Sequence, residues 1–449
     1  MISKVLIPNR GEIALRIIKA CKALGIRTVA AVSEADKESL PAKFADEVVC
    51  IGPSHPSESY LKIETIITAA LGTGANAIHP GYGFLAEQWE LAEACETHGL
   101  IFIGPPGEII KKMGNKLQAR QIAEESKIPV LPGSQRIQNV EDAIFWAKEI
   151  GYPVILKAAA GGGGRGMRII TTPAELKANF EAAAAEALAA FGDGSLYLER
   201  YIPNARHIEV QILGDKFGNV IHLGERDCTL QRRYQKIIEE APASFLPLKV
   251  REDICTAAVK LAKSIGYENA GTIEFIFDQD EAKFYFLEVN TRIQVEHPVT
   301  EMVTGIDIVQ EQIRIAAGEH IRLSQAEIKI MGHAIECRVT AESPEEGFRP
   351  SPGRITRWIP PKGPGIRVDT HCYTGYFVPP YYDSLLAKVI TVGINRREAI
   401  KRMEYALQNF VIEGVETTLP FLKFLITQPE YIEGKVNTKW VEMVSKKTV

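Results

Sequence analysis

The stretch GTIEFIFDQDEAKFYFLEVNTRIQVEHP occupies residues 271–298 and carries the clearest local pattern in the chain. Residues 271–277 and 283–290 are rich in β-branched and aromatic residues, and a polar DQDE segment separates them. Two such runs around a polar turn predict a β-hairpin. A hairpin centred on Glu281 gives these cross-strand pairs: Phe277 with Tyr285, Phe275 with Leu287, and Glu274 with Glu288.

The predicted hairpin places two carboxylates, Glu274 and Glu288, directly opposite each other. Opposed like charges destabilise a sheet, and a cation bound between them removes the conflict. Asn290 lies two residues beyond Glu288 and shares its face. Two carboxylates and one amide oxygen suit Mg²⁺ held together with nucleotide phosphates. The pattern therefore favours a metal site, and the alternative is a solvated charged face with a different register.

Polar residues continue with period two beyond the hairpin. If the chain stays extended, one surface carries, in order, Glu288, Asn290, Arg292, Gln294 and Glu296. The planar guanidinium of Arg292 matches a planar anion such as bicarbonate, and the carboxylate of Glu296 could take a proton. The alternative, an amphipathic strand that faces water, predicts a less selective choice of polar residues.

A second pattern is the glycine run in KAAAGGGGRGM, residues 157–167. Consecutive glycines cost conformational entropy, and a chain tolerates them where backbone N–H groups approach an anion or where a flap moves. No Gly-Lys-Ser/Thr follows, so this is not a Walker loop. A flexible hairpin explains the run equally well. The basic and polar segment 225–236, taken alone, predicts a solvated surface.

The first hundred residues alternate strand-like and helix-like segments. Residues 4–8 and 28–32 are typical of strands, and residues 12–24 between them have helical apolar spacing. This β-α-β order predicts a parallel sheet. The turn after the first strand is PNRGE, which lacks Gly-x-Gly-x-x-Gly, so NAD binding is not expected.

The composition narrows the class of protein. The chain has 449 residues, 46% apolar and 24% charged, which is typical of a globular protein of several domains. A net charge of −4 without a basic block argues against nucleic-acid binding. No run is apolar and long enough to span a membrane, and no secretory signal begins the chain, so a cytoplasmic location is expected. The seven scattered cysteines predict reduced, mostly buried thiols.

Taken together, these segments resemble biotin carboxylase, an ATP-grasp enzyme, over essentially the whole chain. The resemblance is carried by these stretches: 7–14, 79–87, the glycine run, 225–236 and 288–301, with NTRIQVEHP at 290–298 the most specific. It implies an α/β and α+β multidomain fold with a Rossmann-like parallel-sheet domain, a mobile glycine-rich lid and a mixed C-terminal domain. The implied division is 1–113 for the N-terminal domain, 114–130 for a linker, 131–203 for the lid, and 204–449 for the ATP-grasp core and C-terminal domain.

The resemblance also implies roles for individual residues. The implied nucleotide contacts are Lys116, Lys157, Gly163, Gly164, His207, Gln231 and Tyr234, with Glu199, Arg200, Tyr201 and Ile202 at the adenine hinge. The implied ligands of Mg²⁺ or Mn²⁺ are Glu274, Glu288 and Asn290. The implied bicarbonate site is Lys236, Arg292, Gln294 and Val295, with Glu296 as the base. Arg338 is implied to steady the biotin enolate and Tyr82 to lie beside biotin, whereas Tyr234 replaces the histidine that the family usually has there.

The implied activity is ATP- and bicarbonate-dependent carboxylation of biotin through carboxyphosphate. No Met-Lys-Met biotinylation motif lies near the C-terminus, so biotin is expected on a separate biotin carboxyl carrier protein, with a carboxyltransferase subunit for the final acceptor. Family members are often homodimers. Acetyl-CoA, propionyl-CoA, pyruvate and 2-oxoglutarate all stay open as acceptors. The alternatives are another ATP-grasp ligase, such as a carbamoyl-phosphate or purine-pathway enzyme, and a nucleotide-binding regulator without turnover.

Overall fold

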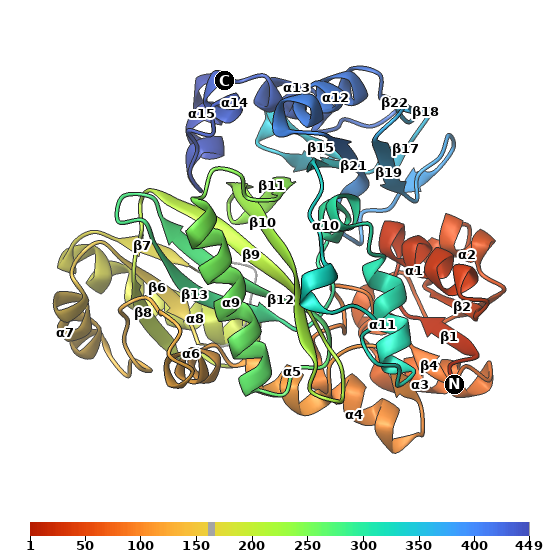
Figure 1. Cartoon of the computed structure of the whole chain (residues 1–449), viewed down its shortest axis with the longest axis horizontal. Coiled ribbons are helices and arrows are strands. Elements are labelled where there is room, and N and C mark those ends of the chain that lie inside the picture. Colours follow the sequence, from red (N-terminus) through yellow and green to blue (C-terminus); the bar gives the residue numbers. More distant parts are fainter. Residues whose placement is uncertain (160–166, 449) are drawn as a thin grey trace.

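The computed structural model describes residues 1–159 and 167–448, and its N-terminal part is built on a parallel sheet (Figure 1). The strand order is β3-β2-β1-β4-β5. In α1, Ile13, Ile17 and Cys21 recur at helical spacing and are buried against this sheet. The predicted β-α-β start is confirmed. The elements are β1 (Lys4–Ile7), α1 (Gly11–Ala23), β2 (Arg27–Val32), α2 (Leu40–Phe44), β3 (Glu47–Cys50), α3 (Ile63–Gly72), β4 (Ala77–Ile78), α4 (Trp89–Thr97), β5 (Ile101–Phe102) and α5 (Gly107–Gly114).

A smaller antiparallel sheet, in the order β7-β6-β8, forms a lobe with two helices at the left of Figure 1. Its elements are α7 (Val140–Ile150), β6 (Val154–Ala158), β7 (Arg168–Ile170), α8 (Pro173–Phe191) and β8 (Leu196–Arg200). Leu156, Leu176 and Leu198 share the apolar core of this lobe. The glycine run falls on residues 160–166, outside the described residues, and so do the expected contacts of Gly163 and Gly164.

The centre of the molecule is a long antiparallel sheet in the order β13-β12-β9-β10-β11-β14-β21-β19. Its strands are β9 (Ala205–Gly214), β10 (Val220–Arg232), β11 (Gln235–Ala241), β12 (Asn269–Asp278), β13 (Lys283–Asn290), β14 (His333–Thr340), β19 (Ile366–Thr370) and β21 (Leu385–Gly393). Helix α9 (Leu248–Ser264) contacts β9 and β10, and buries Ile254, Ala258 and Leu261 in a shared apolar core. This sheet carries most of the polar residues predicted for the site.

The predicted hairpin is present as β12 and β13, with Glu274 opposite Glu288 as expected. A β-bulge at Leu287 shifts the pairing on the turn side of these carboxylates by one residue. The observed pairs there are Phe275 with Phe286 and Phe277 with Phe284, so the predicted pairs with Leu287 and Tyr285 are wrong. The shift places Phe275 edge to face with both Phe284 and Phe286 in one apolar core.

The C-terminal part packs on the other end of the central sheet (blue, Figure 1). Val339 and Val389 of the sheet share a core with Met403 and Leu422 of α12 and α13. The helices are α10 (His297–Thr304), α11 (Ile308–Ala316), α12 (Arg396–Gln408), α13 (Leu419–Ile426), α14 (Pro429–Ile432) and α15 (Trp440–Thr448). The short strands are β15 (Glu342–Ser343), β16 (Arg349–Pro350), β17 (Gly353–Arg354), β18 (Arg357–Ile359), β20 (Phe377–Val378) and β22 (Val411–Glu413).

Segment 114–130, expected to link two domains, contains helix α6 (Lys116–Glu125). Its Ala119 and Ala123 are buried in the core beneath the central sheet, and α6 contacts β13. Among the helices of the described ranges, none combines the length and the apolarity that a membrane span needs. The expectation of free thiols is confirmed, because Cys50 is exposed and the other six cysteines are free and buried.

Candidate active site

A cavity of about 1210 Å³ opens where the N-terminal part, the small lobe and the central sheet meet. Ordinary small-molecule sites have volumes of about 300–1,000 Å³, so this one can hold a nucleotide together with smaller substrates. The expected site residues that line it are Tyr82, Lys116, Lys157, Arg200, Tyr201, Ile202, His207, Gln231, Tyr234, Lys236, Glu274, Glu288, Asn290, Arg292, Gln294, Val295, Glu296 and Arg338. The sequence pattern thus indicates residues that the fold does bring together.

Glu199 is the exception among the described residues predicted for the site. Its carboxylate is buried and paired with Lys157 (Nζ–Oε2, 2.5 Å) and Arg120 (Nη1–Oε1, 3.2 Å). Burial opposes ionisation, yet these cations, Lys157 first, lower the pKa of the Glu199 carboxyl. Lys157, expected to meet phosphate, is therefore held at the start of the hinge, on strand β6 beside β8.

Three carboxylates form a row across neighbouring strands on the floor of the cavity. Glu209 of β9 pairs in register with Glu274 of β12, and Glu274 pairs with Glu288 of β13. Glu209 is 0% exposed and Glu274 4% exposed. Glu209 is absent from the predicted site residues, although its place in the alternating stretch HIEVQ, two residues after His207, is a usable signal.

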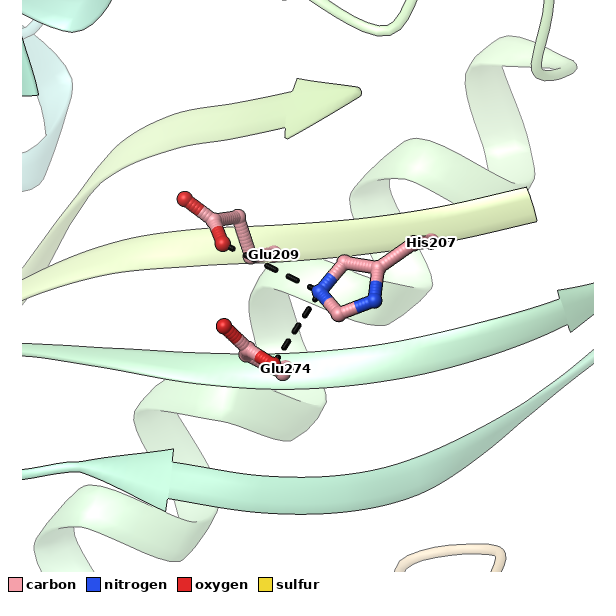
Figure 2. Close-up of side chains that lie close together, drawn as sticks. All are labelled: His207, Glu209 and Glu274. Atoms are coloured by element: carbon pink, nitrogen blue, oxygen red, sulfur yellow. Dashed lines mark ion pairs between the residues drawn. The ribbon is translucent and has the colours of Figure 1, made fainter. Parts of the chain in front are cut away.

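His207 lies on the same face of β9 as Glu209 (Figure 2). Its Nε2 is 3.1 Å from Oε2 of Glu274 and 4.0 Å from Oε2 of Glu209. One ligand atom from each of these three residues lies within 4.8 Å of the others. The resemblance implies a phosphate contact for His207, and the structure adds its contact with the carboxylate row.

Lys236 neutralises much of the negative charge of this site. Its Nζ lies 2.6 Å from Glu209, 2.9 Å from Glu274 and 2.6 Å from Glu296. Burial opposes the ammonium form, but these three carboxylates raise the pKa of Lys236 well above its usual value. Arg226, 0% exposed, adds a second cation 2.5 Å from Glu209.

The prediction of a solvated surface for residues 225–236 is therefore wrong. Most of the segment belongs to β10 in the middle of the sheet, where Arg226, Thr229 and Gln231 are buried. Buried charges are tolerated when they are paired and hydrogen-bonded. Arg226 meets that condition through Glu209, Gln211, Thr272 and Thr300.

The prediction that the chain stays extended through Glu296 is also wrong. Strand β13 ends at Asn290, and Glu296 is the N-cap residue of α10. The irregular path between them is held by hydrogen bonds of its own. Arg292 donates to Glu87 (Nε–Oε2, 2.9 Å) and to Gln294 (Nη1–Oε1, 2.5 Å), and Gln294 donates to Glu274 (Nε2–Oε1, 3.0 Å). The polar side chains still converge on one cavity, by these contacts rather than by strand alternation.

Glu296 lies between two cations. Its Oε2 accepts from Arg338 Nη2 at 2.9 Å, and its Oε1 accepts from Lys236 at 2.6 Å. Burial opposes ionisation, but Lys236 and then Arg338 hold the pKa of the Glu296 carboxyl far below its usual range. A second acid, Glu239, which the sequence pattern did not indicate, accepts from Arg338 Nε at 2.6 Å. Burial raises the pKa of the Glu239 carboxyl to about 7, with Arg338 opposing and Glu296 adding to the shift.

The proposed metal ligands fit a hard divalent cation. Glu274 and Glu288 are register partners, and Asn290 follows on the face of Glu288. Mg²⁺ prefers oxygen ligands, and this trio offers two carboxylates and an amide oxygen. The group of His207, Glu209 and Glu274 includes a ring nitrogen, which softer metals prefer. The oxygen set therefore suits Mg²⁺ or Mn²⁺ better.

Tyr234, the residue that departs from the family pattern, lies at the tip of the β10–β11 hairpin. Arg233 and Tyr234 both have positive φ, at 50° and 65°. A two-residue hairpin turn of this kind requires positive φ at both positions. Lys439 Nζ lies 4.9 Å from the centre of the Tyr234 ring, which lines the nucleotide end of the cavity beside Tyr201 and Arg200.

The sequence matches the family models described as "Biotin carboxylase, N-terminal domain" at residues 1–110, "Carbamoyl-phosphate synthase L chain, ATP binding domain" at 115–324, and "Biotin carboxylase C-terminal domain" at 336–443. The chain is 54% identical over 443 residues to biotin carboxylase 1 of Bacillus subtilis, covering 98% of each protein. The chain belongs to the biotin carboxylase family. As a biotin carboxylase, it is an ATP-dependent ligase that carboxylates biotin with bicarbonate. The fold and family expected from the sequence are confirmed.

Other relatives of this biotin carboxylase belong to different carboxylase systems. A pyruvate carboxylase subunit of Methanothermobacter thermautotrophicus is 50% identical and is covered over 90% of its length by 98% of this chain. The biotin carboxylase domain dimer of 2-oxoglutarate carboxylase from Hydrogenobacter thermophilus, solved with MgADP, ADP and bicarbonate, superposes with a TM-score of 0.96 at 52% identity, covering 99% of this chain and 98% of that one. The alternatives of another ATP-grasp ligase or a regulator without turnover are set aside by full-length likeness to biotin carboxylases.

Proposed function

We propose that the cavity residues divide the reaction between a bicarbonate end and a nucleotide end, joined by the carboxylate row. The observation that carries this proposal is the position of Glu296, an ionised carboxylate fixed between Lys236 and Arg338 on the cavity wall. Bicarbonate binds to Lys236, Arg292, Gln294 and the backbone of Val295. Glu296 removes its proton, and the resulting oxygen attacks the γ-phosphorus of ATP to form carboxyphosphate and ADP.

The low pKa of Glu296 does not prevent this step. An anion that binds between Lys236 and Arg292 competes with Glu296 for the same cations. Loss of cation contacts raises the proton affinity of a carboxylate, so bicarbonate binding itself makes Glu296 a stronger base. A base whose pKa moves toward the working pH is a more effective catalyst.

The nucleotide end comprises the hinge and the phosphate contacts. We assign adenine to the backbone of residues 199–202 and the phosphates to Lys116, Lys157 and His207, with Gln231 and Tyr234 nearby; Gly163 and Gly164 are proposed from the resemblance alone. Glu274, Glu288 and Asn290 would hold Mg²⁺ or Mn²⁺, which neutralises charge on the phosphates when bound. Lys116 Nζ lies 3.8 Å from Glu288, so the phosphate contacts adjoin the metal ligands.

The biotin end comprises Arg338 and Tyr82. Carboxyphosphate breaks down to CO₂ and phosphate, the phosphate takes the N1′ proton of biotin, and the nitrogen then attacks CO₂. The guanidinium of Arg338 stabilises the enolate oxygen of biotin as this charge develops. Tyr82 lines the same cavity and lies beside the ring.

We propose the following setting for the enzyme. Biotin arrives on a separate carrier protein and the carboxyl group leaves through a separate carboxyltransferase, by analogy with the pyruvate carboxylase relative, which is named as one subunit of its enzyme. The homodimer is proposed by analogy with the dimeric 2-oxoglutarate carboxylase domain. The cytoplasmic location and the division at residues 113, 130 and 203 are proposed from the sequence. Identifying the biotinylated protein that copurifies with the chain tests the choice of acceptor.

Glu288→Gln should weaken metal binding without disturbing the rest of the site, because Glu288 makes no close ion pair with Lys236 or Arg338. Loss of an outer-shell partner costs roughly 10–100-fold in metal affinity, so removal of a direct ligand should weaken Mn²⁺ binding in the presence of ADP by at least about tenfold. Titration followed by Mn²⁺ electron paramagnetic resonance measures this affinity. Glu64→Gln, at an exposed position, is the control. Unchanged Mn²⁺ affinity in Glu288→Gln contradicts the proposed ligand set.

A further inference from the structure

The turn PNRGE after the first strand has no role in the reaction described above, although its place in the sheet is one where other α/β folds bind nucleotides. Here the turn contacts the chain itself. The Asn9 side-chain amide donates to the backbone carbonyls of Pro80 and Tyr82, at 2.7 Å each. The turn therefore fixes the loop that carries Tyr82, at the biotin end of the cavity.

Glu12, in the first turn of α1, extends this contact. It is 3% exposed, and its Oε1 accepts a hydrogen bond from the Tyr82 hydroxyl. The same oxygen lies 3.0 Å from Nζ of Lys388 on strand β21. One carboxylate of the N-terminal part thus joins a biotin-side tyrosine to a lysine of the C-terminal part.

Lys388 makes the next link. It is 0% exposed, and its ammonium donates to the carbonyl oxygen of Val295 at 2.8 Å. That carbonyl belongs to the peptide group between Val295 and Glu296, the proposed base. A valine can offer an anion only its backbone, and within the described part of the chain the Val295 N–H donates to no backbone carbonyl. The orientation of this peptide therefore bears on both bicarbonate binding and the base.

We propose that Lys388 is a positioning residue, which fixes the Val295–Glu296 peptide for bicarbonate and, through Glu12, fixes Tyr82 for biotin. The inference builds on the roles proposed above for Val295, Glu296 and Tyr82. A buried ammonium is costly unless it is paired and hydrogen-bonded, and both partners of Lys388 lead toward the cavity. The arrangement ties the two substrate ends of the site to one side chain.

Lys388→Met keeps the length of the side chain and removes its charge and donors. We expect the KM for bicarbonate in ATP hydrolysis to rise about tenfold, the loss expected for one hydrogen bond made by a charged group, while the KM for ATP stays within about twofold. Thermal unfolding of each variant checks the fold. Lys401→Met, at an exposed position of α12, is the matched control and should leave both KM values unchanged. A folded Lys388→Met with an unchanged KM for bicarbonate, or with equal increases for bicarbonate and ATP, overturns the proposal.

Glu12→Gln is the second variant, and it decides the question if Lys388→Met does not fold. It keeps an acceptor for Tyr82 and removes the charge beside Lys388. We expect the KM for free biotin to rise more than the KM for bicarbonate, because Tyr82 is the direct partner of Glu12. An unchanged KM for biotin overturns the proposal. If ATP hydrolysis by the unmodified protein did not respond to bicarbonate, the proposed function itself would fail, and that result is read before any variant is compared.

Discussion

Glu296→Gln should lose bicarbonate-dependent ATP turnover by about a thousandfold, within the range of roughly 10²–10⁴ for loss of a general base. The carboxylate is 0% exposed and fixed between Lys236 and Arg338. Glutamine has the same shape and its amide oxygen can still accept from one of the two cations, so the fold and the binding of ATP should survive. What the variant lacks is the basic oxygen that takes the proton of bicarbonate.

The measurement is ATP hydrolysis as a function of bicarbonate, with ATP affinity and thermal unfolding measured beside it. Glu64→Gln, the exposed control used for the metal site, should behave like the unmodified protein. A Glu296→Gln variant that keeps bicarbonate-dependent turnover within about tenfold of the parent falls outside the range for a lost base. The role of Glu296 would then be electrostatic, and the base would have to be sought elsewhere.

Arg338→Ala should impair biotin carboxylation by about a hundredfold or more, the order of loss when one stabilising donor is removed from a developing oxyanion. Bicarbonate-dependent ATP hydrolysis should fall less, because Arg338 is assigned to biotin and not to the phosphates. It should still fall, because Arg338 also holds Glu296 and Glu239. Without it the pKa of each carboxyl rises further, and the pH optimum of ATP hydrolysis should move upward.

Both rates are measured on the same preparation, with free biotin as the acceptor. Arg397→Ala, at an exposed position of α12, is the matched control. Glu239→Gln separates the two effects, because it keeps the guanidinium and removes one of its acceptors. Equal loss of carboxylation and of ATP hydrolysis in Arg338→Ala contradicts the biotin role.

The hairpin shows how far sequence reasoning reaches. Alternation and turn composition place Glu274 opposite Glu288, and the structure agrees. The same reasoning misplaces the phenylalanine pairs by one residue, because the bulge at Leu287 is set by packing in the apolar core. A bulge inserts one residue without changing the composition of the strand, so the pattern alone does not locate it.

The buried charges are harder to predict. Residues 225–236 are as polar as an exposed segment, and only the pairing of Arg226 with Glu209 explains their burial in β10. Partners such as Glu209 and Glu239 come from strands that the sequence does not align with one another. Local pattern identifies a polar residue on a strand, whereas its charge partner depends on the order of the strands in the sheet.

The prediction for the stretch after the hairpin is right in its residues and wrong in its path. Arg292, Gln294 and Glu296 do line one cavity. They converge because Arg292 binds Glu87 of the N-terminal part and Glu296 caps α10. Contacts between distant segments therefore replace strand alternation as the cause.

The central claim, that this site uses ATP to activate bicarbonate for transfer to biotin, is tested most directly by ATP hydrolysis of the unmodified protein. The rate is measured with Mg²⁺ over a series of bicarbonate concentrations, with and without free biotin. We expect a rate that rises with bicarbonate, saturates, and rises again when biotin is added. A rate that is unaffected by bicarbonate, with biotin present or absent, would contradict the claim.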